Sequence, residues 1–242
     1  MHFDEVVKIR RSIRDFSSET VPDIIIEKVL SSALSSPSSS NTQPYKIAVA
    51  KGAICDEIRN ELSQKYQKAS KINGMKHPGK LIHALVGKVT GVLPDGDFKT
   101  DTNYPPELKK RAQECGVGLY DTLNINRKDY VARDRQMLRN FELFDAPVAI
   151  FVFVHAERGV FSALDAGMFM QSLMLAATAE GLGTCAQGSL ATWASPVKKR
   201  FNVDKDYKLI CGISMGYPSD HIVNGYRPDK VTVDDICFSN KA

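Results

Sequence analysis

The stretch Pro147-Val148-Ala149-Ile150-Phe151-Val152-Phe153-Val154-His155 decides the fold. Its apolar run, 148–154, has the length of a β-strand and carries no charge, which is typical of a strand buried on both faces. A second apolar stretch, 161–180, has the length of a helix and is followed by Gly181 and Gly183, residues that commonly end helices. These two stretches predict a central strand covered by a long buried helix.

Further elements are expected on both sides of this pair. A helix at 22–35 begins with Pro22, a residue suited to a first helical turn. The order of the elements predicts an α+β fold in which helices surround one central mixed β-sheet. The other predicted elements are helices at 4–10, 55–68, 107–121 and 127–141 and strands at 45–50 and 209–214.

The size and composition of the chain fit one domain. It has 242 residues, of which 43% are hydrophobic and 25% charged, as in ordinary soluble folds. We therefore expect a single domain over 1–242. Within it, the segment 71–106 is polar and rich in glycine and proline, so about 65–135 is expected to form an insertion of helices and loops on the surface.

Charge, cysteine and histidine usage argue against several classes of protein. The net charge of +4 is small and spread along the chain, which argues against nucleic acid as a partner and favours a small anionic ligand. The five cysteines contain no C-x-x-C pair and are expected to be reduced thiols. The five histidines have no paired spacing, so we expect no metal site.

The sequence also argues against a membrane location. The first residues, Met1-His2-Phe3-Asp4-Glu5, carry acid where a secretory leader needs base. The stretch 159–192 lacks Lys and Arg, but Asp165, Gln171 and Glu180 interrupt it, so a buried helix is expected there instead of a membrane span. The protein is expected to be cytoplasmic.

Three short motifs were weighed against other functions. Gly212-Ile213-Ser214-Met215-Gly216 matches the G-x-S-x-G elbow of serine hydrolases and gives the remote alternative function. That elbow needs a helix after the serine, whereas Pro218 and a polar turn come next. We also reject a dinucleotide loop at 116–121, which lies within a helical pattern, and an EF-hand at Asp95-Gly96-Asp97, which lacks the acidic twelfth residue.

A basic motif near the start of the chain could bind phosphate. Arg10-Arg11-Ser12-Ile13-Arg14 places three guanidiniums and a hydroxyl within about one turn. Guanidiniums hold phosphate oxygens in pairs, so the motif fits a phosphate site. A solvated basic helix end, favoured by the helix dipole, explains this segment alone equally well.

A second motif changes this balance. Pro37-Ser38-Ser39-Ser40-Asn41-Thr42-Gln43-Pro44-Tyr45 is dense in short polar side chains, and by itself it is typical of an ordinary loop. Together, the basic motif and this polar motif resemble the FMN-binding opening of the nitroreductase family. Two further matches are Glu180-Gly181-Leu182-Gly183-Thr184 and Gly216-Tyr217-Pro218 followed by Arg227.

The resemblance covers about 3–55 and 140–238 and leaves the insertion at 65–135 unmatched in detail. Within the family, the chain resembles the nitrobenzoate-reductase-like branch through Asn140-Phe141, Phe144-x-Ala146-Pro147 and Cys185-Ala186-Gln187-Gly188. Tyr45 stands where many relatives have Trp. The resemblance implies a nitroreductase-like fold that works as a homodimer.

The resemblance also implies which residues bind the cofactor. Arg10, Ser12 and Arg227 are expected to hold the FMN phosphate, with Arg11 assisting through its backbone. Arg14 is expected to reach the pyrimidine edge of the flavin, where a positive charge favours the reduced form.

The remaining implied contacts surround the flavin ring and its ribityl chain, with FMN sites at the subunit interface. The backbone N–H near Gly188 is expected to donate toward flavin N5, and a backbone pressed against a planar ring leaves little room for a Cβ. The other residues are Pro37, Ser38, Ser39, Asn41 and Gln43 from the partner subunit, and Ala186, Gln187 and Ser189 beside the ring.

The implied activity is an FMN-dependent oxidoreductase with a ping-pong mechanism. NADH or NADPH would reduce the flavin, and a nitroaromatic, a quinone or an activated alkene would then take the electrons. The insertion at 65–135 would shape the acceptor pocket. No catalytic side chain is expected, because the flavin carries the chemistry. A dehalogenase-like or flavin-sequestering protein of the same fold stays open as the alternative.

Overall fold

A four-stranded antiparallel sheet forms the centre of the molecule. The computed structural model describes residues 1–73, 87, 91–99 and 103–239. The strands are β1 (Tyr45–Lys51), β2 (Val148–His155), β3 (Gly183–Gln187) and β4 (Tyr207–Gly216), in the order β1-β2-β4-β3. The predicted run at 148–154 is buried throughout β2, which pairs with β1 on one side and β4 on the other. The expected central strand is confirmed.

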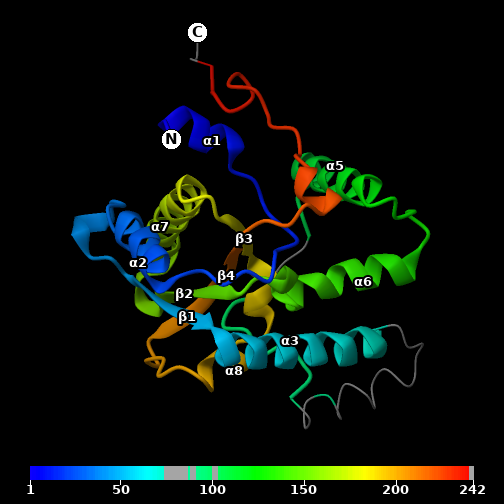
Figure 1. Ribbon diagram of the computed structural model, residues 1–242, viewed down its shortest axis with the longest axis horizontal. Helices are drawn as coiled ribbons and strands as arrows, with labels where there is room; N and C mark the ends of the chain where they lie inside the picture. Colours follow the sequence, from blue (N-terminus) through cyan, green and yellow to red (C-terminus); the bar gives the residue numbers. More distant parts are fainter. Residues whose placement is uncertain (74–86, 88–90, 100–102, 240–242) are drawn as a thin grey trace.

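Helices cover both faces of this sheet, which confirms the α+β arrangement (Figure 1). Most predicted helices are present with shifted ends. The main helices are α1 (Phe3–Ile9), α2 (Asp23–Ala33), α3 (Gly52–Asn73), α5 (Pro106–Thr122), α6 (Tyr130–Phe141), α7 (Val160–Ala179) and α8 (Ser195–Lys198). Short 3₁₀ helices lie at Ser39–Asn41, Leu143–Asp145, Ala156–Arg158, Gly188–Thr192 and Ile222–Gly225.

Alternating residues of β2 supply two separate hydrophobic cores. Ile150 and Val152 belong to the core that α2 and α7 cover. Phe151 and Phe153 belong to the core on the other face, with residues of α3 and Trp193. Successive side chains of a strand point to opposite faces, so a strand between two helical layers has no polar side. This explains why β2 shows no alternation in its sequence.

The strand directions differ from the mixed sheet that the element order predicts. All three strand pairs are antiparallel, and the parallel contact in the described residues is an isolated bridge between Ser12 and Thr184. Strand direction depends on how connections cross the sheet, which local patterns do not encode. The sequence analysis also missed β3, because this strand is short and begins with Gly183 and Thr184 where a helix stop was expected.

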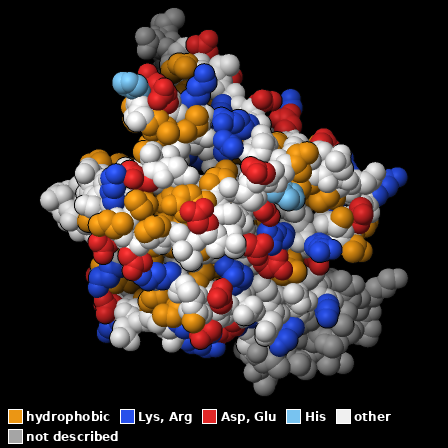
Figure 2. Space-filling view, in the orientation of Figure 1, with side chains coloured by type: hydrophobic (Ala, Val, Ile, Leu, Met, Phe, Trp, Pro, Cys, Tyr) orange, Lys and Arg blue, Asp and Glu red, His pale blue; other side chains and the backbone are white. Residues whose placement is uncertain are grey.

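Helix α7 is apolar on all sides, and the protein buries only part of it. It is long and apolar enough to cross a membrane by length and composition, a test that core helices of soluble proteins also pass. Phe169 and Leu173 are buried against α2 and the sheet, but Phe161 and Leu164 are 58% and 59% exposed. Figure 2 shows hydrophobic side chains gathered on the face where α1, α2 and α7 lie. Part of the molecular surface is therefore apolar.

The described part of the insertion is tied to the core. Helices α5 and α6 confirm the helical pattern at 107–121 and 127–141, whereas 74–86, 88–90 and 100–102 lie outside the described residues. The turn at Asp95-Gly96-Asp97 is polar, as expected. Asp95 accepts hydrogen bonds from the backbone of Ala194 (2.7 Å) and Ser195 (3.1 Å) at the start of α8. A remote carboxylate thus caps this short helix.

Candidate functional site

The segment after α1 lies along the edge strand β3. The backbone N–H of Ile13 donates to the carbonyl of Thr184 at 2.9 Å, and Ser12 bridges the same residue. A Cβ on Gly183 would stand 2.5 Å from the Ile13 side chain, so glycine is required for this close approach. The match at 180–184 therefore has a structural reason, since it lets the basic segment dock beside the sheet.

Docking brings the four arginines that were predicted to bind FMN together as one group. We call this group the arginine cluster, and its members are Arg10, Arg11, Arg14 and Arg227. The Arg227 guanidinium donates to the carbonyl of Lys8 at 2.6 Å. Burial, together with the charge of Arg227, lowers the pKa of Arg11 below its usual value. Within the described residues, none of these arginines forms an ion pair with a carboxylate. The cluster is a concentration of positive charge without a counterion in the part of the chain that the structure describes.

One residue that the sequence analysis missed holds this cluster in place. Asn224 is 4% exposed, and its side-chain oxygen accepts the backbone N–H of Arg14 at 2.8 Å. Its side-chain nitrogen donates to the carbonyls of Asp15 (2.7 Å) and Ser219 (3.0 Å), and its own carbonyl accepts Nε of Arg11 at 2.5 Å. Nothing local distinguishes Asn224 in the sequence. Its only sign is its position three residues before Arg227.

The polar loop at 37–43 is exposed and locally strained. Ser40, Asn41 and Gln43 have φ values of +51°, +54° and +40°, a left-handed conformation that costs energy in residues other than glycine. The backbone N–H of Ser39 donates to both carboxylate oxygens of buried Asp165, at 3.2 and 3.3 Å, and the backbone of Gln43 donates to the Ser38 hydroxyl at 2.9 Å. These contacts fix the loop, in which Ser38 is half-buried. The exposed residues of the loop include Pro37, Ser39, Asn41 and Gln43.

The loop and the arginine cluster lie at opposite ends of α7 within one chain. The loop contacts Asp165 near the start of the helix. Arg10 and Arg11 line a small cavity with Thr178 and Gly181 at its end. From Asp165 to Thr178 a helix rises about 20 Å. A single chain therefore does not bring the two predicted halves of the site together.

The third predicted segment, Ala186 to Ser189, runs from the end of β3 into a 3₁₀ helix. Ala186 and Gly188 are exposed, and a Cβ on Gly188 would meet nothing within 4 Å. The space beside this backbone is open. The Gln187 side chain is buried and donates to the carbonyl of Asn140 at 2.8 Å, so it points away from that space.

Two nearby side chains carry no nucleophilic chemistry. Ser214 is fully buried within β4 and donates to Oε1 of Gln187 at 2.5 Å, so the G-x-S-x-G motif is not an elbow between strand and helix. Burial raises the pKa of the Cys185 thiol to about 11, despite the nearby charge of Arg14. A thiol with this pKa is protonated at neutral pH.

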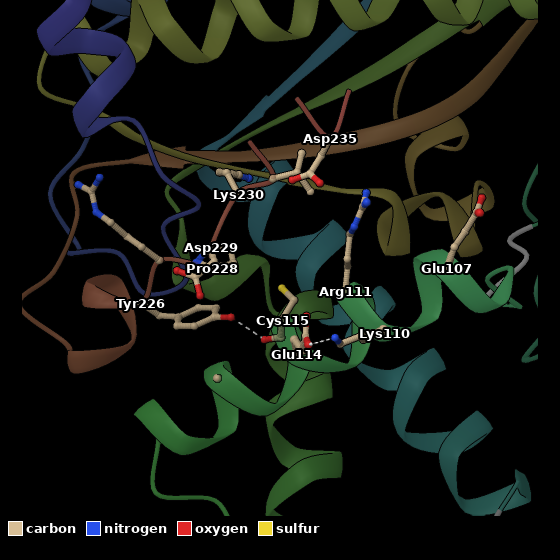
Figure 3. A pocket seen from close by; sticks show the side chains of 13 residues that line it. Glu107, Lys110, Arg111, Glu114, Cys115, Tyr226, Pro228, Asp229, Lys230 and Asp235 are labelled. Atoms are coloured by element: carbon tan, nitrogen blue, oxygen red, sulfur yellow. Dashed lines mark hydrogen bonds and ion pairs between the residues drawn. The ribbon is translucent and has the colours of Figure 1, made fainter. Parts of the chain in front are cut away.

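A cavity of about 830 Å³ opens on the other side of Arg227, between α5 and the C-terminal segment (Figure 3). The Tyr226 hydroxyl donates to the carbonyl of Cys115 at 2.7 Å and ties the C-terminal segment to α5. Burial, together with the neighbouring thiol of Cys115, raises the pKa of Tyr226 to about 12. The insertion thus reaches the neighbourhood of the arginine cluster.

Comparison with known proteins gives a consistent result. A family model described as the nitroreductase family matches residues 7–217. The chain is 30% identical to a 4-nitrobenzoate reductase of Pseudomonas putida over 226 residues, 93% of this chain and 89% of the relative. It is 29% identical to a 4-nitrobenzoate reductase of Nocardioides sp. (strain LMS-CY), covering 89% of this chain and 80% of the relative.

A solved structure has the same fold. It is the FMN-dependent nitroreductase NfnB from Mycobacterium smegmatis in complex with NADPH, with a TM-score of 0.80 at 26% identity. The match covers 98% of this chain and 97% of the other.

Proposed function

Because the chain belongs to the nitroreductase family, we propose that it is an FMN-dependent oxidoreductase that takes electrons from NADH or NADPH and reduces nitroaromatic acceptors. The observation that carries this proposal is the arginine cluster, a set of guanidiniums without carboxylate partners in the described residues. Quinones and activated alkenes belong to the same proposal, since a reduced flavin also reduces such acceptors.

The residues present fit FMN. A phosphate dianion needs several donors, and Arg10, Ser12 and Arg227 would supply them at the edge of β3. Arg11 would assist through its backbone, since its guanidinium donates to the carbonyl of Asn224. Thr184, which bridges Ser12, has a buried hydroxyl without a hydrogen-bond partner among the described residues, so an unused polar group lies next to the basic segment. The open backbone at Gly188 leaves room for a planar ring. Arg14 would face the pyrimidine edge.

The exposed polar loop supports a site shared between two chains. Ser38, Ser39, Asn41 and Gln43 lie too far along α7 to reach a phosphate held by Arg10 of their own chain. We therefore propose a homodimer in which each loop completes the partner's site. Phe161 and Leu164 on α7 offer the apolar surface that obligate interfaces use.

In this proposal the protein positions the reactants, and the cofactor supplies the chemistry. Bound FMN supplies the capacity to accept a hydride and to pass electrons on. The positive charge of Arg14 would favour negative charge at the pyrimidine edge of the flavin. The backbone N–H near Gly188 would donate a hydrogen bond toward flavin N5. Donor and acceptor use the same open face in turn, which is a ping-pong mechanism. The insertion at 65–135 shapes the open face of the flavin where the acceptor binds. The chain forms one domain over 1–242. The protein works in the cytoplasm.

The test begins with protein stripped of flavin. FMN should bind stoichiometrically and give a yellow protein, and NADH or NADPH should bleach it under anaerobic conditions. Addition of nitrobenzene should restore the colour. A protein that does not bind FMN contradicts the whole proposal. A protein that binds FMN but is not bleached by either nicotinamide is a flavin-sequestering protein instead of a reductase.

A further inference from the structure

A groove between α5 and α6 lies outside the site described above. It has a volume of about 810 Å³, within the range of small-molecule sites. Val117, Tyr120 and Ile125 give it an apolar wall, and Arg127 and Arg133 bring positive charge. Of its other charged residues, Lys110 and Glu114 pair with each other at 3.8 Å, and Asp121 is an exposed carboxylate. We call this feature the α5–α6 groove.

Arg133 is the unusual residue of this groove. Its guanidinium carbon lies 5.3 Å from the centre of the Tyr120 ring and 5.9 Å from that of Tyr130. Nη1 donates to the carbonyl of Arg127 at 3.1 Å, whereas Nε is buried and has no partner among the described residues. In the described part of the chain, Arg133 has no carboxylate partner. A guanidinium with spare donors beside aromatic rings can take a carboxylate in a bidentate pair.

The groove adjoins the proposed cofactor site. Ile125 lines both the groove and a smaller cavity of about 240 Å³, and Arg14 lines that smaller cavity. Helix α5 also separates the groove from the cavity beside Arg227, since Gly118 lines both. The groove and the cavity that Arg14 lines therefore share Ile125 as a common wall residue.

We propose that the α5–α6 groove binds the acid group of aromatic-acid acceptors, with Arg133 as the anchor for the carboxylate and Val117, Tyr120 and Ile125 as the surface for the ring. The proposal rests on the reductase function above and adds a substrate class to it. Neutral nitroaromatics have no group for Arg133, so this residue would determine selectivity between acidic and neutral acceptors.

The experiment compares 4-nitrobenzoate with nitrobenzene as acceptors of the flavin-loaded enzyme. Arg133→Gln should lower the ratio of kcat/KM for the acid over that for the neutral compound by about tenfold to a hundredfold, the value of a charged hydrogen-bonded pair. Arg133→Lys keeps the charge and the ring contacts but not the bidentate geometry, and should give an intermediate ratio. Lys128→Gln is the matched control, because Lys128 is an exposed cation of the same hairpin that does not line the groove.

Calorimetric titration with benzoate, which cannot be reduced, provides a second measurement. Benzoate should bind the wild type and the Lys128→Gln variant equally and the Arg133→Gln variant at least about tenfold more weakly. This measurement separates the groove from the reductase activity, since benzoate binding does not require turnover. An unchanged selectivity ratio, or an equal loss for both acceptors with unchanged benzoate binding, overturns the proposal.

Discussion

The protein contains two groups of basic side chains that differ in what neutralises them. In the arginine cluster, the guanidiniums of Arg11 and Arg227 contact backbone carbonyls but no carboxylate among the described residues. Arg200, two residues after α8, pairs with Glu57 of α3 at 2.9 Å and with Glu61 of α3 at 2.8 Å. Helices α3 and α8 lie at the far end of the molecule in Figure 1. We call the second group the Arg200 network.

The difference separates structural charge from charge kept for a ligand. The Arg200 network neutralises itself and links α8 to α3, so it adds modestly to stability. The arginine cluster places like charges together, which is unfavourable until an anion arrives. An anion that binds only the folded protein then stabilises it. The following predictions test this contrast, starting with the largest expected effect.

The largest effect is expected from combining lesions in both halves of the shared site. A chain with Arg10→Ala and Arg227→Ala and a chain with Ser39→Ala and Asn41→Ala should each bind little FMN as homodimers. In the mixed dimer, one site collects all four changes and the other is wild type. Co-expression should therefore restore up to about half of the wild-type activity per mixed dimer. Verified, folded heterodimers that stay inactive would show that each site belongs to one chain.

Single changes in the two basic groups should have opposite consequences. Arg10→Ala or Arg227→Ala should weaken FMN binding about tenfold to a hundredfold, because each removes a charged hydrogen bond worth about 1.5–3 kcal/mol. Arg200→Ala is the control and should leave FMN affinity unchanged. Fluorescence titration of stripped protein measures both. An equal loss of FMN affinity in the Arg200→Ala variant and in the arginine-cluster variants would show that the cluster is not a specific phosphate site.

Asn224→Ala should affect the cluster without removing any charge. The change leaves the carbonyls of Asp15 and Ser219 and the backbone N–H of Arg14 without their partner. We expect FMN affinity to fall about tenfold, with a smaller fall for riboflavin, which lacks the phosphate. A loss shared equally by the two ligands would mean that Asn224 does not position the phosphate site. Asn126→Ala, an exposed change in the α5–α6 hairpin, is the control.

The smallest effect is the pH dependence of the Arg200 network. Burial opposes ionisation of Glu61, but hydrogen bonds from Arg200 and Lys199 outweigh it and hold the pKa of Glu61 below its usual value of 4.5. A lowered pKa stabilises the fold above pH 4.5, and this stabilisation is lost as the pH falls through the folded pKa. Chemical denaturation should measure the free energy of unfolding of the wild type and of Glu61→Gln above pH 4.5 and below the folded pKa of Glu61. The two proteins should differ in this free energy only at the higher pH. A difference that persists below the folded pKa contradicts this linkage.

The sequence by itself determined the helices and strands whose apolar residues form an unbroken run or recur at a regular spacing. The run at 148–154 predicts β2, and the stretch at 161–180 predicts α7, because a segment enclosed by other layers needs no polar side. The motif at 10–14 also predicted a group of phosphate-binding arginines. Local composition carries this information, since a guanidinium has the same donors in any fold.

Only the tertiary structure decided which distant groups meet. It showed that Asn224 holds the segments that carry Arg11 and Arg14, that β3 runs antiparallel to β4, and that the loop at 37–43 lies at the other end of α7. It also showed that Arg133 has no carboxylate partner among the described residues, whereas Arg200 has two. The sequence alone does not show which of these two arginines has carboxylate partners. Whether a charge is paired depends on which carboxylates the fold brings within about 4 Å, and the residues next to it in the chain do not fix that distance.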